Sequence, residues 1–273
     1  QSEQNVTAIV SENFLSDKAT AAILCKQTGA EIFPIDIGIA VDTKLENHKI
    51  AYGTKNMAKE PAMTREEAER AMEVGIEKVR ELSGQGYKII ATGEMGIGNT
   101  TTSSALASYF LQEDVEKMTG RGAGLTSKAL EKKIAVVRKA IADYSPAFTD
   151  AIDALAALGG FDIAGMAGVF LGGAIYRVPI VMDGFISSTA ALTATRICPA
   201  CKDFIMASHV SKEPAAEKIL AALDKEAALH CDMCLGEGTG AVTLFPILDL
   251  ATQIYEQMST FEDIEIDAYV ELK

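Results

Sequence analysis

The stretch YKIIATGEMGIGNTT (87–101) decides the fold. Its apolar run at 87–92 predicts a buried strand, and Gly93, Gly96 and Gly98 predict a tight turn before a helix over 100–111. Glycines let the backbone approach a ligand closely, and the free N–H groups of a helix start point at an anion. We therefore expect a monophosphate or a ribose at this turn. The alternative is a tight turn whose glycines serve geometry alone.

The same turn resembles the phosphate loop of nucleotide triphosphatases, which has the pattern G-x4-G-K-T. Asn99 stands where that pattern requires a lysine, and the lysine is the residue that reaches the terminal phosphates. A triphosphate is therefore not the expected ligand.

Strands and helices alternate along the rest of the chain. Predicted strands cover 31–38, 87–92, 178–183 and 204–208, and predicted helices cover 6–28, 64–84, 100–111, 126–144, 150–158, 163–176 and 240–258. The region 39–63 is irregular and polar, which predicts a long loop. Alternation of this kind indicates an α/β fold, with a parallel sheet covered by helices on both faces.

Composition limits the partners. The chain has 273 residues, is 48% hydrophobic, and carries a net charge of −13 with a pI near 4.8. A phosphate backbone or an anionic membrane would be repelled by such a charge, so neither nucleic acid nor membrane is an expected partner. No apolar stretch is long enough for a membrane span, and no secretion signal opens the chain, so we expect a cytoplasmic protein.

Three further clusters follow predicted strands or precede predicted helices. Glu237 lies in the glycine-rich turn 235–240, where its carboxylate could accept a proton from a ring nitrogen of a flat ligand; the alternative is a solvated loop residue. Asp183 precedes hydroxyl residues that could bind a substrate or simply cap a helix. The segment 208–214 offers hydroxyls and a cation, again for an anion or a cap, and its His209 is expected to be a packed or a surface side chain.

Four of the five cysteines form two CxxC pairs, Cys198/Cys201 and Cys231/Cys234. A strand and a helix are predicted between the pairs, so their convergence on one metal ion is geometrically awkward. We expect small buried residues, with a structural metal and a redox pair as alternatives.

Seven motifs together resemble one family from end to end and in order. They are AYGTKNMAKEPAMTREEA (51–68), GEMGIGNTT (93–101), GRGAGL (120–125), GGFDIAGMAG (159–168), DGFISSTAAL (183–192), ASHVSKEP (207–214) and LGEGTGA (235–241). This set is similar to the signature blocks of the nicotinate-nucleotide–dimethylbenzimidazole phosphoribosyltransferases.

The resemblance implies a Rossmann-like parallel α/β domain over 29–239 and a small helical domain from residues 1–28 and 240–273. It implies a homodimer, no metal and no cofactor. The implied reaction transfers ribose 5-phosphate from nicotinate mononucleotide to 5,6-dimethylbenzimidazole, giving α-ribazole 5′-phosphate and nicotinate in cobamide biosynthesis.

Site residues carry over by motif position. Glu237, between Gly236 and Gly238, is the implied base that takes the azole N–H proton. Lys133, on the helix after GRGAGL, supplies the cation that the phosphate-loop comparison lacks. Asp183 and Ser211 hold the phosphate or ribose. The ribose phosphate is cradled by Glu94, Met95, Gly96, Gly98, Asn99 and Thr100, and the flat base is contacted by Met95 and Leu235.

The resemblance leaves the base and the partner chain open. Family members carry a further N-terminal segment with a strand ending in Asp-His-Gly, which helps to line the base pocket and is not found in these 273 residues. A related enzyme that activates phenolic bases as a heterodimer is one alternative. A non-catalytic partner subunit is another, although retention of Glu237, Glu94 and Lys133 argues against it. A redox or metal module built on the CxxC pairs is the third.

Overall fold

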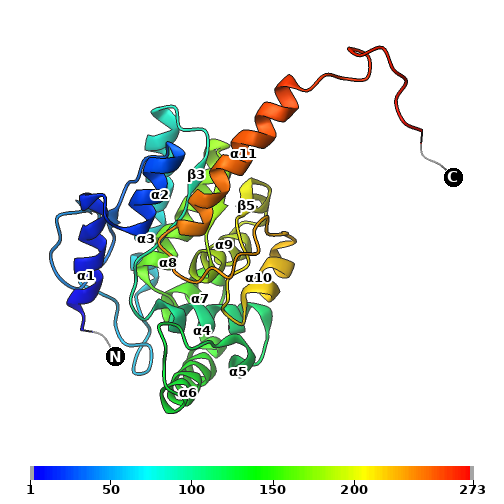
Figure 1. Ribbon diagram of the computed structural model, residues 1–273. Coiled ribbons are helices and arrows are strands. Elements are labelled where there is room, and N and C mark those ends of the chain that lie inside the picture. Colours follow the sequence, from blue (N-terminus) through cyan, green and yellow to red (C-terminus); the bar gives the residue numbers. More distant parts are fainter. Residues whose placement is uncertain (1–2, 271–273) are drawn as a thin grey trace.

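The computed structural model describes residues 3–270 and contains two parallel sheets (Figure 1). The main sheet has the strand order β3-β4-β5, with β3 at Ile90–Ala91, β4 at Ile180–Met182 and β5 at Ile205–Ala207. Ile90 pairs with Ile180, and Ile180 with Ile205. The carboxyl ends of all three strands therefore meet at one edge, which confirms the predicted parallel α/β class.

Helices connect the strands and also lie before the first strand and after the last one. They are α1 (Asn5–Glu12), α2 (Thr20–Thr28), α3 (Arg65–Gly84), α4 (Asn99–Leu111), α5 (Val115–Met118), α6 (Ser127–Tyr144), α7 (Ala151–Leu158), α8 (Phe161–Tyr176), α9 (Phe185–Ile197), α10 (Ala216–Leu223) and α11 (Thr239–Gln257). Short 3-10 helices lie at Asn13–Ser16, Ser145–Ala147 and Pro199–Phe204. Every helix among the described residues is too short or too polar to cross a bilayer.

The central strand β4 is buried on both faces. Ile180 and Met182 belong to the large core that contains α3, α8 and α9, whereas Val181 packs with Ala241 and Leu244 of α11. Successive side chains of a strand point to opposite faces, so helices cover both sides of the main sheet. This layering places the start of α11 beside the ends of the strands.

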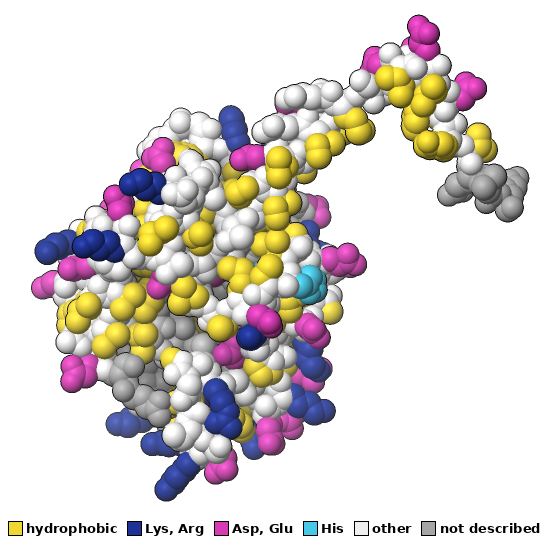
Figure 2. All heavy atoms as spheres, in the orientation of Figure 1, with side chains coloured by type: hydrophobic (Ala, Val, Ile, Leu, Met, Phe, Trp, Pro, Cys, Tyr) yellow, Lys and Arg dark blue, Asp and Glu magenta, His cyan; other side chains and the backbone are white. Residues whose placement is uncertain are grey.

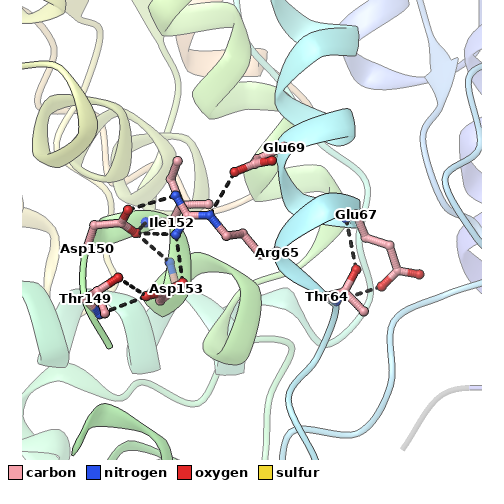
Figure 3. A network of polar contacts seen from close by, with 8 residues as sticks. All are labelled: Thr64, Arg65, Glu67, Glu69, Thr149, Asp150, Ile152 and Asp153. Atoms are coloured by element: carbon pink, nitrogen blue, oxygen red, sulfur yellow. Dashed lines mark hydrogen bonds and ion pairs between the residues drawn. The ribbon is translucent and has the colours of Figure 1, made fainter. Parts of the chain in front are cut away.

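Polar contacts at the start of α3 fix its direction (Figure 3). Thr64 and Glu67 form a capping box: the Thr64 side chain accepts from the Glu67 backbone, and the Glu67 side chain accepts from the Thr64 backbone. Arg65 forms ion pairs of 2.8 Å with both Asp150 and Asp153 at the start of α7. The groups are partly exposed, so we expect the network to orient the two helices more than it stabilises them.

The predicted helix 6–28 is wrong because the chain breaks it. Asp17 adopts a left-handed conformation with φ of 57°, Ala19 is extended, and a new helix begins at Thr20. The apolar periodicity continues across the break, which is why the sequence pattern did not reveal it. As a result α2 turns to pack against α11.

The expected loop 39–63 contains one strand of a second, small sheet, and the predicted strand 31–38 is shorter than expected. Strand β1 (Ile35–Asp36) pairs in parallel with β2 (Glu46–Asn47). The segment is held by a buried ion pair of 2.7 Å between Lys49 and Asp36. Asp36 also accepts from the backbone of Gly38 and Ile39, which satisfies its buried charge.

Helix α2, from the N-terminal part of the chain, packs against α11 from the C-terminal part. The expected small helical domain stays a prediction, as do its boundaries and those of the large domain. Beyond this contact the far part of α11 and residues 258–270 extend away from the body of the molecule (Figure 1).

Candidate active site

Two glycine-rich turns lie side by side at the carboxyl edge of the main sheet. The first glycine turn (93–98) follows β3, and the second glycine turn (236–240) leads into α11. A Cβ atom on Gly93 would lie 2.7 Å from the backbone nitrogen of Gly238 and 2.8 Å from the carbonyl carbon of Glu237. Only glycine allows this approach, so the two turns form one surface. Ligands of parallel α/β folds bind at this edge.

Asp183, at the end of β4, anchors the second glycine turn. Its carboxylate accepts hydrogen bonds from the backbone N–H groups of Gly240 (2.8 Å), Ala241 (3.1 Å) and Gly238 (3.2 Å). A carboxylate at the N-terminus of α11 is also favoured by the helix dipole. Asp183 is almost fully buried, and its two oxygens serve the protein itself in this structure. A contact of Asp183 with ribose or phosphate stays a prediction.

His209 packs under the second glycine turn, as expected from the sequence. A Cβ on Gly240 would lie 2.0 Å from Nδ1 of His209, which also lies 3.0 Å from Oγ of Ser208. Burial lowers the pKa of His209, and the charge of Asp183 opposes the shift. A neutral imidazole therefore fills the space between the end of β5 and α11.

Glu237 lies within the second glycine turn. Its backbone is left-handed, with φ of 62°, between Gly236 and Gly238 with φ of 85° and 78°. Among the described residues, its Oε2 atom is buried and has no hydrogen-bond partner. Burial raises the pKa of Glu237, the backbone amide of Ala21 lowers it, and the charge of Asp183 raises it further. A carboxylate with one free oxygen and a raised pKa is suited to accept a proton.

Glu94 lies in the first glycine turn and shares a partner with Asp162. The side-chain amide of Asn99 donates to Oε2 of Glu94 and, at 2.8 Å, to Oδ2 of Asp162 at the start of α8. Burial raises the pKa of Glu94 to about 8, and the charges of Asp162 and Asp183 add to the rise, while the Asn99 hydrogen bond opposes it. Glu94 is therefore largely protonated at neutral pH.

Lys133 reaches the start of α4 from α6. Its ammonium group donates to Oγ1 of Thr100 and to the carbonyl oxygen of Gly120, both at 3.0 Å. The lysine is buried, and burial lowers its pKa, whereas the carboxylate of Glu213 raises it. The cation predicted for the first glycine turn thus lies next to it, although it comes from a different helix.

A cavity of about 870 Å³ opens at the two turns. Its lining includes the predicted residues Glu94, Met95, Gly96, Gly98, Asn99, Glu237 and Gly238. The predicted residues Thr100, Lys133, Asp183, Ser211, Leu235 and Gly236 are not part of its wall. Thr100 and Lys133 are linked to it through the start of α4. Leu235, by contrast, is 57% exposed. Within the described part of the chain, Ser211 accepts a single hydrogen bond, from the Glu213 backbone at 3.4 Å.

Several wall residues were missed from the sequence. Met95 packs with Phe14, Ala21 and Ala22 of the N-terminal helices, which close one side of the cavity. Asp162 was missed too, although its place after two glycines at a helix start in GGFD (159–162) was a usable signal. The N-terminal wall has no comparable motif, because its residues are ordinary apolar positions of helices.

The cysteines do not assemble a metal site. Cys201 is buried, and burial raises its pKa to about 12. Cys231 and Cys234 are exposed, so the expectation that all four are small buried residues is wrong for this pair, which lies on a surface loop. No cluster of three or more His, Cys, Asp or Glu side chains with metal-binding geometry occurs within residues 3–270.

The fold and the site define the class of protein. A family model described as Phosphoribosyltransferase matches residues 1–266, and the chain belongs to this family of enzymes. A relative from Clostridium acetobutylicum, named nicotinate-nucleotide–dimethylbenzimidazole phosphoribosyltransferase, is 50% identical over 99% of this chain and 78% of its own length. A protein of the same name from Acetivibrio thermocellus is 48% identical over 97% of this chain and 77% of its own length.

Solved structures agree with the sequence relatives. The crystal structure of CobT from Thermus thermophilus matches with a TM-score of 0.93 and 35% identity, over 97% of this chain and 80% of that chain. The family resemblance found in the motifs is thereby confirmed, together with the α/β fold.

Proposed function

We propose that this chain transfers ribose 5-phosphate from nicotinate mononucleotide to 5,6-dimethylbenzimidazole or a related base, giving α-ribazole 5′-phosphate and nicotinate. The printed names of the relatives support this reaction. The observation in the structure that carries it is Glu237, whose Oε2 has no protein partner in the described chain and whose turn packs against the first glycine turn at the mouth of an 870 Å³ cavity.

Glu237, the first glycine turn and Lys133 each have a separate role in the proposed reaction. One azole nitrogen attacks the anomeric carbon of the ribose, while the bond from that carbon to the pyridinium nitrogen breaks and nicotinate leaves with the electron pair. Glu237 takes the proton from the other azole nitrogen, which removes the positive charge that forms on the attacking ring. The first glycine turn and Lys133 hold the ribose phosphate, so that the two reacting atoms stay aligned.

Substitution of Glu237→Gln tests the proposal. The variant keeps the shape of the side chain and loses the base, so kcat should fall about 10²- to 10⁴-fold, while nicotinate mononucleotide still binds. Glu217→Gln is the matched control, since Glu217 is exposed on α10. The assay measures nicotinate release and product mass with a panel of azoles and phenols.

Unchanged turnover in Glu237→Gln would remove Glu237 from the mechanism. Nucleotide binding without nicotinate release for any base would instead identify a non-catalytic subunit.

We also propose that the chain is a homodimer. The far part of α11 exposes Ile247, Leu250 and Ile254 along one stripe, and Leu250 and Ile254 are each 59% exposed. Met258, directly after the helix, is exposed as well. Figure 2 shows apolar side chains along this helix. Exposed apolar stripes of this kind mark interfaces. Sedimentation should give a dimer that Leu250→Glu dissociates; a mass doubled only with a second, related chain would indicate a heterodimer.

The cytoplasm is the compartment that fits this function. All five cysteines are free thiols, as is usual where glutathione and thioredoxin keep proteins reduced. The substrates are small molecules, and the net charge of −13 is unsuited to nucleic acid or to an anionic membrane surface.

A further inference from the structure

We propose that Asp162 is a positioning residue of the transfer reaction: through the side-chain amide of Asn99, it holds Glu94 in the orientation in which Glu94 donates a hydrogen bond to a ribose hydroxyl of the nucleotide. This inference rests on the proposed function. It concerns a residue of α8 that was not among the site residues predicted from the sequence.

The contacts form a chain from α8 to the second glycine turn. Asn99 has two N–H groups on its amide, and it uses both, one on Asp162 at 2.8 Å and one on Glu94. The backbone N–H of Gly96 also donates to Oε2 of Glu94, at 3.2 Å. Oε2 is thus held by two donors, and the other oxygen of Glu94 lies 2.8 Å from where a Cβ on Gly236 would be. The free side of Glu94 therefore faces the turn that carries Glu237.

Two glycines leave room for the carboxylate of Asp162. A Cβ on Gly96 would lie 2.6 Å from Oδ2 of Asp162, and a Cβ on Gly160 would lie 2.7 Å from Oδ1. Each oxygen thus occupies space that only a glycine leaves free, and the carboxylate fits closely between Gly96 and Gly160. The amide of Asn99 donates to this carboxylate and also to Glu94, so the position of Asp162 helps to orient Glu94.

Charge explains why Glu94 is a donor and Glu237 an acceptor. Asp162 from α8, Asp183 from the end of β4 and Glu237 from the second glycine turn are the acidic groups around Glu94, and the charges of Asp162 and Asp183 help to keep its proton in place. The incoming nucleotide carries a phosphate and a carboxylate. A neutral Glu94 avoids repelling these anions and offers a hydrogen to the ribose, whereas Glu237 can ionise to act as the base.

Two substitutions separate this role from a purely structural one, because they shift the pKa of Glu94 in opposite directions. Asp162→Asn removes a charge that favours protonated Glu94 and should shift the alkaline limb of the kcat/KM profile down by about one pH unit. Asn99→Ala removes the hydrogen bond that favours ionised Glu94 and should shift the limb up. Asp153→Asn, at the corresponding place in the first turn of α7, is the matched control and should leave the profile unchanged.

The titration of Glu94 should also be followed directly, by carbon-13 NMR of protein labelled at the glutamate carboxyl carbons. The signal of Glu94 is assigned by its loss in Glu94→Gln. A titration of Glu94 that is the same in Asp162→Asn as in the natural protein would overturn the inference, even if turnover is normal. Absence of turnover with every base would instead count against the proposed function, while the NMR titration would still test the link between Asp162 and Glu94.

Discussion

The carboxylate of Asp183 accepts a hydrogen bond of 2.8 Å from the backbone N–H of Gly240, which ties the end of β4 to the start of α11. Two further backbone donors, Gly238 and Ala241, point to the same carboxylate. The position of Glu237 therefore depends on an aspartate at the end of β4. Asp183 shapes the site whether or not it also touches a substrate.

Asp183→Ala should lower both stability and turnover. Three buried N–H groups lose a charged acceptor, which should reduce the free energy of unfolding by about 3 kcal/mol. The second glycine turn would also lose its anchor, so kcat should fall at a temperature where the variant is still folded. Urea unfolding and single-turnover kinetics measure the two effects. Asp203→Ala, a control at an exposed position of the 3-10 helix before β5, should change neither. A folded Asp183→Ala variant with normal kcat would show that the anchor is dispensable.

Gly93→Ala should separate the two glycine turns. The added methyl group would lie 2.7 Å from the nitrogen of Gly238, so one turn must shift, at a cost of about 1–3 kcal/mol. We expect a loss of turnover larger than the loss of nucleotide affinity, because the base moves relative to the ribose. Gly84→Ala is the control: it has open space around it at the end of α3. Equal turnover in the two variants would contradict the close packing of the turns.

Lys133→Gln should weaken binding of nicotinate mononucleotide. The buried ammonium lies beside Thr100 at the start of α4, and loss of one charged hydrogen bond to phosphate should raise the dissociation constant about 10- to 100-fold. Calorimetry with the nucleotide alone measures the effect. Lys132→Gln removes the same charge from the exposed neighbouring position and should bind normally. Equal weakening in both variants would point to general electrostatics and not to a specific contact.

Glu94→Gln should make the protein more stable at alkaline pH. The folded state holds the Glu94 proton up to about pH 8, whereas an unfolded glutamate releases it near its ordinary value of 4.5. Between these two values the folded state binds more protons, so this group's contribution to stability falls as pH rises. The melting temperature of Glu94→Gln should therefore exceed that of the natural protein by an amount that grows from about pH 5 to about pH 8. A difference independent of pH would mean that Glu94 is not protonated in the folded state.

Local secondary structure and the candidate base could be predicted from the sequence. The capping box at Thr64, the strand, glycine turn and helix at 87–111, and the placement of Glu237 between glycines depend on residues a few positions apart, whose preferences are set by short-range geometry. The order of strands and helices then determined a parallel α/β fold, and the motifs determined the family.

Which residues meet was decided only by tertiary structure. Asp183 and Gly240 are 57 positions apart, and Asn99 and Asp162 are 63 apart. The break at Asp17, which turns α2 toward the cavity, also has no periodic signal. Such contacts depend on how helices pack around the sheet, and packing is selected by the whole core and not by any one segment.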